Sequence, residues 1–326
     1  MTNSLSLKVL VIGGAGYIGS HVNSALIKAG HQPTVFDNLS SGLRENLFEN
    51  IPFIHGDVLL SEHINKAVIG MDAIIHLAAL KAAGESMLKP EVYIQNITGA
   101  INILNAAVAA GVSQFIFSST AAVYGDPQYL PIDEEHPTDP VNFYGFTKLE
   151  IERLLAWYDQ LKGIKYVNLR YFNAAGYDME GNIKGLEQNP QNLFPLIMEA
   201  VMGKRTQVDV YGNDYDTADG TGIRDYIHVT DLADAHVSAL NYLIENQQSN
   251  IFNLGSSSGT SVLEALETTK KMTGARFKVN MVPRRPGDPP VVLANPQKAN
   301  QILNWKAKYS NAEDIVRTML DAYRNQ

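Results

Sequence analysis

The first half of the chain alternates short runs of β-branched and apolar residues with longer segments of helical pattern. The apolar runs are KVLVIGG (8–14), PTVFDN (33–38), DAIIHLA (72–78), QFIFSST (114–120) and KYVNLRYFN (165–173). The helical segments between them cover residues 17–30, 61–70, 91–111 and 142–163, and several end at glycine. Runs that are apolar on both faces are typical of buried parallel strands. The alternation therefore predicts a doubly wound α/β sheet with right-handed crossovers.

Beyond Phe172 the alternation of predicted strands and helices becomes less regular. GNDYDTADGTG (212–222) and VPRRPGDPP (282–290) are rich in Gly, Asp and Pro and are predicted loops, whereas IRDYIHV (223–229) and IFNLGS (251–256) have the pattern of strands. We therefore expect a first domain of residues 1–172, to which segments from about 226–254 return, and a smaller α/β lobe formed mainly by residues 173–326.

Composition limits the kinds of function that need to be considered. The 326 residues are 45% hydrophobic and 18% charged, as in ordinary soluble globular proteins, and the length suits two lobes with a cleft between them. A net charge of −8 argues against general affinity for nucleic acid or anionic membranes. The sequence has no cysteine, which excludes disulfides, thiolate metal sites and a cysteine nucleophile, and no metal site is expected. The amino-terminal apolar run is too short for a signal peptide or membrane span, so we expect a cytoplasmic protein.

A glycine loop joins the first predicted strand to the first predicted helix. Gly13, Gly16 and Gly19 have the spacing G-x-x-G-x-x-G, which permits a tight turn and lets backbone N–H groups approach a pyrophosphate. A glycine-rich turn without a ligand is the alternative, but the strand before and helix after favour a Rossmann dinucleotide site. Asp37 ends the second strand, 18 residues after Gly19. Its carboxylate suits the adenosine ribose hydroxyls and would repel a 2′-phosphate, so NAD is favoured over NADP, although capping of the following turn is the other reading of Asp37.

Hydroxyl groups follow a later strand, at the sheet edge where open α/β sheets bind ligands. They belong to Ser118, Ser119 and Thr120, and Tyr144 and Lys148 follow at a four-residue spacing that places one side chain over the other in a helix. A free phenol titrates near 10, and a neighbouring ammonium and a nicotinamide cation would lower its pKa. Hydroxyl, phenol and lysine together suit proton movement at a sugar or alcohol oxygen while hydride passes to NAD.

Several longer motifs resemble those of the extended short-chain dehydrogenase/reductases, and among these the UDP-glucose 4-epimerases. The resemblance covers nearly the whole chain. The motifs are GGAGYIGSH, FDNLS, HLAALKAAGES, FIFSSTAAVYGD, YGFTK, LRYFNAAG, NLFPLI, YGNDYDTADGTGIRDYIHV, DLADAHV, NLGSSSGTSV and PRRPGD. The resemblance implies interconversion of UDP-glucose and UDP-galactose by an enzyme that uses NAD.

The same resemblance assigns site residues. It implies catalytic roles for Thr120 as the hydroxyl, Tyr144 as the base and Lys148 as its partner. For the cofactor it implies contacts from the glycine loop, the adenosine pocket, the residues beside the nicotinamide, and the catalytic tyrosine and lysine. These residues are Gly13, Gly16, Tyr17, Ile18, Gly19, Asp37, Asn38, Asp57, Val58, Leu77, Ala78, Ala79, Lys81, Asn96, Tyr144, Lys148 and Phe172. For the UDP-sugar it implies Thr120, Tyr144, Asn173, Asn192, Leu193, Arg224, Arg285, Asp288 and Val292. The two arginines would grip the diphosphate, because each guanidinium offers a fork of N–H donors.

The implied reaction is an internal oxidation and reduction at the hexose C4. Tyr144 takes the proton of the 4-hydroxyl while hydride leaves C4 for NAD, and the sugar swings about its diphosphate bond before the hydride returns to the other face. Val292 stands where well-known bacterial members of the family have a tyrosine near the sugar 2-position, so we expect room for UDP-N-acetylhexosamines. Family members usually dimerise through two long helices, here expected at residues 91–111 and in the helix that carries Tyr144.

Three related activities and one binding function remain as alternatives. Nucleotide-sugar dehydratases have an acidic pair directly after the hydroxyl residue, and uronate decarboxylases have a Glu in that turn, whereas this chain has Ala121 and Ala122. Both activities therefore rank well below epimerisation. UDP-uronate 4-epimerisation is not excluded by the sequence. A non-catalytic NAD-binding sensor on the same fold would commonly lack the tyrosine, which is present here.

Overall fold

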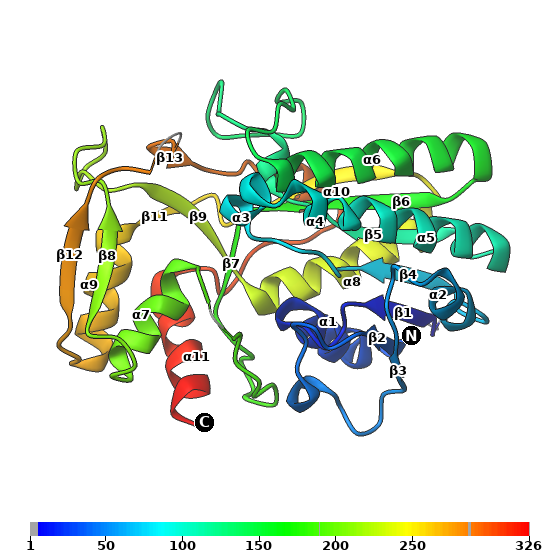
Figure 1. The fold of residues 1–326 in the computed structure, drawn as a ribbon, viewed down its shortest axis with the longest axis horizontal. Coiled ribbons are helices and arrows are strands. Elements are labelled where there is room, and N and C mark those ends of the chain that lie inside the picture. The colour runs from blue at the N-terminus through cyan, green and yellow to red at the C-terminus, as the bar shows by residue number, and fades with distance from the viewer. Residues whose placement is uncertain (1–5, 189, 286–287, 326) are drawn as a thin grey trace.

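The computed structural model describes residues 6–188, 190–285 and 288–325, and a parallel seven-stranded sheet dominates this part of the chain (Figure 1). From edge to edge the strand order is β10 (Asn250–Leu254), β6 (Lys165–Tyr171), β5 (Gln114–Ser118), β4 (Ala73–His76), β1 (Lys8–Ile12), β2 (Gln32–Asp37) and β3 (Phe53–His55). The order reverses at β1, which lies between β2 and β4. The predicted doubly wound sheet is confirmed.

Helices cover both faces of this sheet (Figure 1). α1 (Tyr17–Lys28) and α8 (Val229–Asn246) lie on one face, and α2 (Ser61–Ala67), α5 (Gln95–Ala110) and α6 (Phe143–Lys162) lie on the other. In β1, Val9 and Val11 belong to the core under α1 and α8, whereas Leu10 and Ile12 belong to the core under α2, α5 and α6. The four residues from Val9 to Ile12 are all apolar because both faces of the strand are buried there, whereas Lys8 at its start is exposed.

The ends of the helices follow local sequence signals. The Asn142 side chain accepts a hydrogen bond from Gly145 N at 2.8 Å and begins α6. Gly111 and Gly163, each with φ 74°, end α5 and α6 as the sequence indicated. The helix expected at residues 91–111 is interrupted at Ile94, between α4 (Pro90–Tyr93) and α5, and α3 (Ala83–Leu88) precedes it.

A smaller lobe lies beside the large sheet (Figure 1). Its sheets pair β9 (Ile223–His228) with β7 (Asn173–Ala175), β11 (Gly259–Ser261) and β13 (Val291–Val292), and β8 (Gln207–Tyr211) with β12 (Lys278–Val282). α7 (Leu193–Val201), α9 (Val262–Thr273) and α11 (Ala312–Arg324) enclose a separate core with these strands. Short turns of helix occur at η1 (Arg44–Asn46), η2 (Ala121–Val123) and α10 (Gln297–Ile302).

Parts of the second half of the chain pack on the large sheet. β10 pairs with β6, α8 packs on α1, and Trp305 is buried in the same core. The domain division at residue 172 itself stays a prediction. Pro286 and Gly287 of the PRRPGD motif lie outside the described residues. Over the described ranges, no helix combines the length and apolar character needed to cross a bilayer.

Candidate active site

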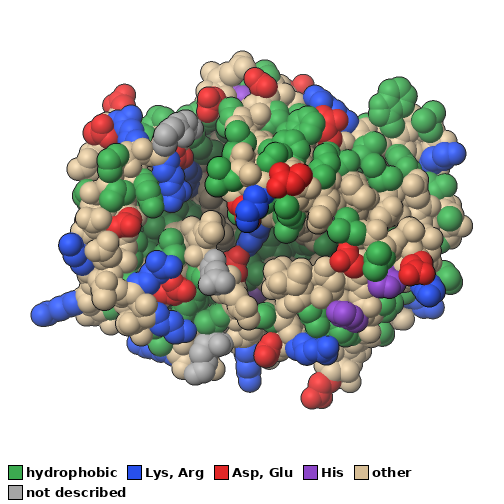
Figure 2. All heavy atoms as spheres, in the orientation of Figure 1, with side chains coloured by type: hydrophobic (Ala, Val, Ile, Leu, Met, Phe, Trp, Pro, Cys, Tyr) green, Lys and Arg blue, Asp and Glu red, His purple; other side chains and the backbone are tan. Residues whose placement is uncertain are grey.

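The predicted site residues gather where the carboxyl ends of the parallel strands meet the smaller lobe. Figure 2 shows a hollow between these two parts of the molecule, with charged side chains of both signs near it. The glycine loop follows β1, Asp37 ends β2, residues 77–81 follow β4, and Thr120 follows β5. Because all of these strands are parallel, their carboxyl ends lie at one edge of the sheet.

The glycine loop leaves space that side chains would fill. Gly13 has φ 84°, and a Cβ there would lie 2.6 Å from the backbone nitrogen of Ala78. A Cβ at Gly19 would collide with the backbone of Gly13 and Gly14, so glycine lets α1 lie directly on the loop. Gly16 is the residue before α1 and has no side chain that could cap the first turn, which contains Tyr17 and Ile18. An uncapped helix start against a loop without side chains fits an anionic diphosphate.

The Tyr17 side chain is directed away from that loop. Its hydroxyl donates a hydrogen bond to the carbonyl oxygen of Gly176 at 2.5 Å, and its ring packs with the core of the smaller lobe. Any contact that Tyr17 makes with a diphosphate is therefore a backbone contact.

The Asp37 carboxylate is held by two backbone donors. Oδ2 accepts from Ala15 N at 3.0 Å and Oδ1 accepts from Leu39 N at 2.8 Å. Burial raises the pKa of Asp37, and these two hydrogen bonds oppose the shift. Each oxygen keeps a lone pair for a ribose hydroxyl. Asn38 Nδ2 donates to Asp57 Oδ2 at 3.2 Å, which brings these two predicted residues together, and Val58 beside them packs on Gly99 of α5.

Asn96 holds the segment after β4 in place. Its Oδ1 accepts from Leu80 N at 2.9 Å, and its Nδ2 donates to Leu80 O at 3.0 Å and to Thr147 Oγ1 at 3.2 Å. Leu77 N and Ala78 N donate to Ile12 O, at 2.8 and 3.0 Å. The segment that contains Leu77, Ala78, Ala79 and Lys81 is thus fixed between the glycine loop and α6. The Lys81 side chain forms an ion pair with Glu187 of the smaller lobe.

Thr120, Tyr144 and Lys148 lie together at the end of β5. Lys148 Nζ donates to the carbonyl oxygen of Ser118 at 2.8 Å and lies 4.7 Å from the centre of the Phe117 ring. Thr120 begins η2 and its Oγ1 accepts from Ala122 N at 3.2 Å. Tyr144 N donates to Ser86 Oγ at 3.0 Å, so α3 supports the start of α6.

Burial dominates the electrostatics of this group in the chain by itself. Burial raises the pKa of Tyr144 above its usual range, and a hydrogen bond with Thr120 opposes the shift only in part. Burial also lowers the pKa of Lys148 to about 7. In the chain by itself, removal of the phenol from water dominates, and Lys148 donates its hydrogen bond to Ser118. The lowering expected from Lys148 together with a bound nicotinamide cation stays a prediction.

The predicted substrate residues line the facing side, from the smaller lobe. Asn173 Nδ2 donates to Asp225 O at 3.1 Å, and Asn192 and Leu193 begin α7. Arg224 NH2 donates to Asp288 Oδ1 at 2.5 Å, and the Arg285 guanidinium lies 3.9 Å from the centre of the Tyr211 ring. Val292 and Phe172 pack on the cluster of Val123, Tyr124, Ile132 and Leu149 together with Ala121. Val292 is thereby close to the turn that follows Thr120.

Sequence reasoning missed a buried group behind the catalytic residues. Glu152 pairs with Arg170 and accepts a hydrogen bond from Ser119. The available signal was spacing, since Glu152 lies four residues after Lys148 and eight after Tyr144. Tyr211 was also missed, because its contact with Arg285 joins residues far apart in the sequence.

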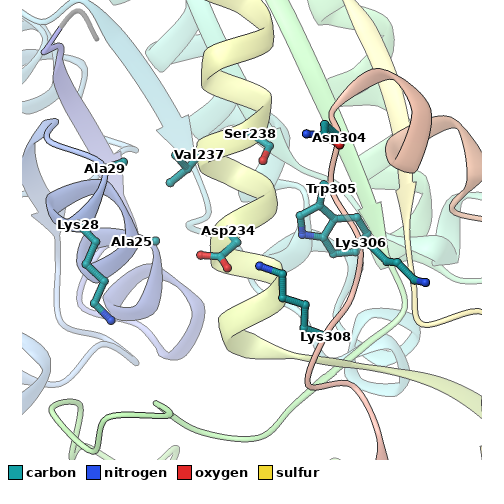
Figure 3. Close-up of a pocket in the computed structure, with 10 residues that line it drawn as sticks. All are labelled: Ala25, Lys28, Ala29, Asp234, Val237, Ser238, Asn304, Trp305, Lys306 and Lys308. Carbon is teal, nitrogen blue, oxygen red and sulfur yellow. The ribbon is translucent and has the colours of Figure 1, made fainter. Parts of the chain in front are cut away.

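A cavity of about 370 Å³ lies elsewhere, between α1, α8 and the segment after α10 (Figure 3). None of the predicted site residues lines it. Figure 3 shows the Lys308 ammonium directed toward Asp234, and Lys28 pairs with Glu180. This cavity is therefore separate from the candidate active site.

Comparisons with known proteins agree with this geometry. A model described as the NAD dependent epimerase/dehydratase family matches residues 9–255. The UDP-glucose 4-epimerase of Lactobacillus helveticus is 43% identical over 318 residues, which is 96% of each chain. The crystal structure of UDP-glucose 4-epimerase from Brucella ovis in complex with NAD has a TM-score of 0.95 at 40% identity and covers 98% of both chains. The UDP-Glc/GlcNAc 4-epimerase of Campylobacter jejuni has a TM-score of 0.87 at 38% identity and covers 98% of this chain and 100% of its own.

Proposed function

Because this chain belongs to the NAD-dependent epimerase/dehydratase family, we propose that it interconverts UDP-glucose and UDP-galactose by inverting the hexose C4, with NAD as cofactor. The near full-length similarity to UDP-glucose 4-epimerases supports the substrate class. The absence of cysteine from the sequence suits a reducing compartment, and we place the protein in the cytoplasm.

One observation carries the proposal. A hydroxyl, a phenol and a lysine, from Thr120, Tyr144 and Lys148, meet at the carboxyl edge of the sheet beside a loop shaped for a dinucleotide diphosphate. When bound, NAD would supply the acceptor and donor of hydride for the hexose C4. Tyr144 removes the proton from the 4-hydroxyl and later restores it, and Thr120 holds the sugar oxygen toward the phenol. The Lys148 ammonium stabilises the phenolate.

The turn after Thr120 favours epimerisation over elimination. η2 begins with Ala121 and Ala122, whose methyl groups neither donate nor accept protons. A dehydratase needs an acid and a base for the loss of water across C5 and C6. Glu152, the buried carboxylate behind this turn, is occupied by Arg170.

The grip on the substrate is strongest at the nucleotide diphosphate. Arg224 is held in place by Asp288, and Arg285 is supported by the Tyr211 ring. Two fixed guanidinium groups suit the four charged and partly charged oxygens of a diphosphate. Asn173, Asn192 and Leu193 complete the proposed contacts. Few of the proposed contacts fall on the hexose itself, which would leave it free to turn between the two hydride transfers.

We extend the substrate range to UDP-N-acetylhexosamines. Val292 packs beside Phe172 and Ala121, and its short side chain leaves space next to the sugar 2-position. The Campylobacter jejuni protein is named for both glucose and N-acetylglucosamine substrates, which supports a range of this width in the family.

The second proposed partner is another copy of the chain. α5 exposes Ile101 and Val108, seven residues apart, and α6 exposes Trp157 and Leu161, at 60% and 68%. α5 and α6 are in contact, and Figure 2 shows apolar side chains gathered over this part of the molecule. A paired face of this kind fits a homodimer in which two helices of each subunit pack together.

The proposal is tested with purified protein, UDP-galactose and no added NAD. Formation of UDP-glucose is expected, because the mechanism requires the cofactor to stay bound throughout. Tyr144→Phe should lower the rate by roughly 10²–10⁴-fold while the bound NAD is unchanged. Full activity of Tyr144→Phe would remove the phenol from the mechanism, and absence of any UDP-hexose turnover in the parent protein would contradict the proposed function.

A further inference from the structure

We propose that Glu152, held by Arg170, is a positioning residue that fixes the strand end carrying Thr120 against the helix carrying Tyr144 and Lys148. The proposal rests on the proposed epimerase function and adds to it the groups that hold the catalytic residues together.

Three consecutive residues at the end of β5 each meet one residue of α6. Tyr144, Lys148 and Glu152 lie on one face of the helix at four-residue spacing. The carbonyl oxygen of Ser118 accepts from Lys148 Nζ at 2.8 Å. Ser119 Oγ donates to Glu152 Oε1 at 2.5 Å, and Thr120 lies beside the phenol. Ser119 directly precedes Thr120, and Glu152 lies one helical turn after Lys148. The hydrogen bond between Ser119 and Glu152 therefore joins the strand end to the helix next to the catalytic residues of each.

Arg170 of β6 fixes the Glu152 carboxylate. Nε donates to Oε1 at 3.0 Å and NH2 donates to Oε2 at 2.6 Å, and both side chains are 5% exposed. This bidentate geometry allows one orientation of the carboxylate. A buried pair of this kind is weak evidence of stability by itself, because desolvation offsets the attraction. Because Glu152 also accepts the hydrogen bond from Ser119, the ion pair holds Ser119 in place whatever its net effect on stability.

The same arginine also holds the far end of the catalytic turn. Arg170 NH1 donates to the Tyr124 hydroxyl at 3.0 Å, which in turn donates to Asn253 Oδ1 at 2.6 Å. Thr120 precedes η2 and Tyr124 follows it. The turn that presents the Thr120 hydroxyl is therefore fixed on both sides, through Ser119 and through Tyr124.

Glu152 also acts on the charge of Lys148. Burial lowers the pKa of Lys148 to about 7, and the Glu152 carboxylate opposes this shift. The other titratable groups around Lys148 and its hydrogen-bond acceptor Ser118 are Tyr144 on α6, His76 on β4, Arg170 and Tyr171 on β6, and His236 on α8. Burial lowers the pKa of His76 to about 3 and that of His236 to about 4, so both rings are neutral near pH 7. Loss of the Glu152 charge would therefore lower the pKa of Lys148 further.

Two variants separate position from charge. Ser119→Ala cuts the link but keeps the ion pair, and we expect kcat to fall on the order of tenfold with unchanged KM, NAD content and pH profile. Glu152→Gln removes the charge as well, and we expect a larger fall together with a shift of the alkaline limb of kcat to lower pH, because the ammonium form of Lys148 is lost earlier. Thermal unfolding and NAD content show whether each variant is folded.

A second readout does not depend on turnover. NMR titration of ¹³C-labelled lysine, with Lys148→Met for assignment, should give a lower pKa for Lys148 in Glu152→Gln and an unchanged pKa in Ser119→Ala. Folded, NAD-loaded variants that both keep kcat and the Lys148 pKa of the parent protein would overturn the proposal. A parent protein without UDP-hexose turnover would defeat the proposed function instead, and the titration would still test the coupling.

A different observation leads us to infer that residues 185–187 close over the cofactor and retain it. Gly185 N donates to Asn46 Oδ1 at 3.0 Å, and Asn46 Nδ2 donates to Ala15 O of the glycine loop at 3.2 Å. Two residues later, Glu187 pairs with Lys81. Asn46 follows β2 and Lys81 follows β4, and β1 with its glycine loop lies between these strands.

The segment therefore bridges the loop where a Rossmann fold holds the diphosphate. The backbone from residue 185 to residue 187 reaches about 7 Å, whereas the distance from β2 across β1 to β4 is about 10 Å. The side chains of Asn46, Lys81 and Glu187 cover the remaining distance. Glu180, five residues before Gly185, pairs with Lys28 of α1 at 2.7 Å and anchors the preceding part of the same stretch of chain. These links must open before a bound dinucleotide can leave.

Retention is tested by the rate of NAD loss from the purified protein, measured with excess dehydrogenase that captures free NAD. Glu187→Gln and Asn46→Ala should each speed release by roughly threefold or more. Glu85→Gln, which breaks the exposed pair with Lys89, is the matched control and should release NAD at the parent rate. Equal release rates in all four proteins would overturn the inference.

Discussion

The ammonium nitrogen of Lys148 lies 6.0 Å from the centre of the Tyr144 ring, one helical turn away. Its hydrogen bond goes to the carbonyl oxygen of Ser118 instead of the phenol. The lysine thus acts on the phenol as a nearby charge, and that charge is present only below its lowered pKa of about 7.

Burial of Lys148 should make stability depend on pH. Its pKa is about 7 in the folded chain and about 10.4 in the unfolded chain, so the unfolded chain binds more protons between these values and stability rises with pH there. Lys148→Met should be more stable than the parent near pH 7, by roughly 2 kcal/mol, and the difference should shrink near pH 9.5. Urea unfolding at both pH values measures it, and a difference that is independent of pH would argue against a lowered lysine pKa.

Arg285 should contribute to binding and not to the chemical step. Arg285→Ala removes a donor fork from the diphosphate, and KM for UDP-galactose should rise roughly tenfold with little change in kcat or NAD content. Arg285→Lys keeps the charge but not the planar set of donors, and its KM should lie between those of the parent protein and Arg285→Ala. Steady-state kinetics give the comparison. A kcat defect at unchanged KM would place Arg285 elsewhere in the mechanism.

Val292 should set the room available at the sugar 2-position. Val292→Tyr should reduce turnover of UDP-N-acetylgalactosamine about tenfold or more while UDP-galactose turnover is little changed. Val292→Ala is the control and should keep both activities. If the parent protein turns over UDP-galactose rapidly and UDP-N-acetylgalactosamine not at all, the wider substrate range is wrong.

The exposed apolar face of α5 and α6 should hold two subunits together. Trp157→Glu places a charge in that face, and light scattering should then give half the mass of the parent protein. Met281, 44% exposed on β12 of the smaller lobe, provides the control, and Met281→Glu should stay dimeric. A parent protein that is already monomeric would contradict this assembly.

Much of the fold could be predicted because local pattern and tertiary setting agree. The run from Val9 to Ile12 is apolar on both faces, and helices do cover both faces of β1. Gly111 and Gly163 end helices where the sequence indicated. The break at Ile94 was not predicted, because the apolar pattern continues through it. The pairing of β8 with β12 joins segments about 70 residues apart, for which the chain has no local signal.

The candidate site was predictable in its residue types but less so in its electrostatics. The four-residue spacing of Tyr144 and Lys148 places them correctly on one helix face. The sequence expectation counted the charge of the lysine and left out burial, which depends on all the elements packed around the phenol. The pair of Glu152 and Arg170 needs α6 and β6 to be placed side by side before it can be recognised.

The central claim is that hydrogen leaves C4 as hydride and returns to the same carbon without exchange with water. The most direct measurement is conversion of UDP-galactose in D₂O, followed by NMR of the UDP-glucose formed. We predict no deuterium at C4 and none at any other carbon of the hexose, because Tyr144 exchanges only the hydroxyl proton. Deuterium at C4 would contradict the account, since it would require proton transfer with solvent at that carbon.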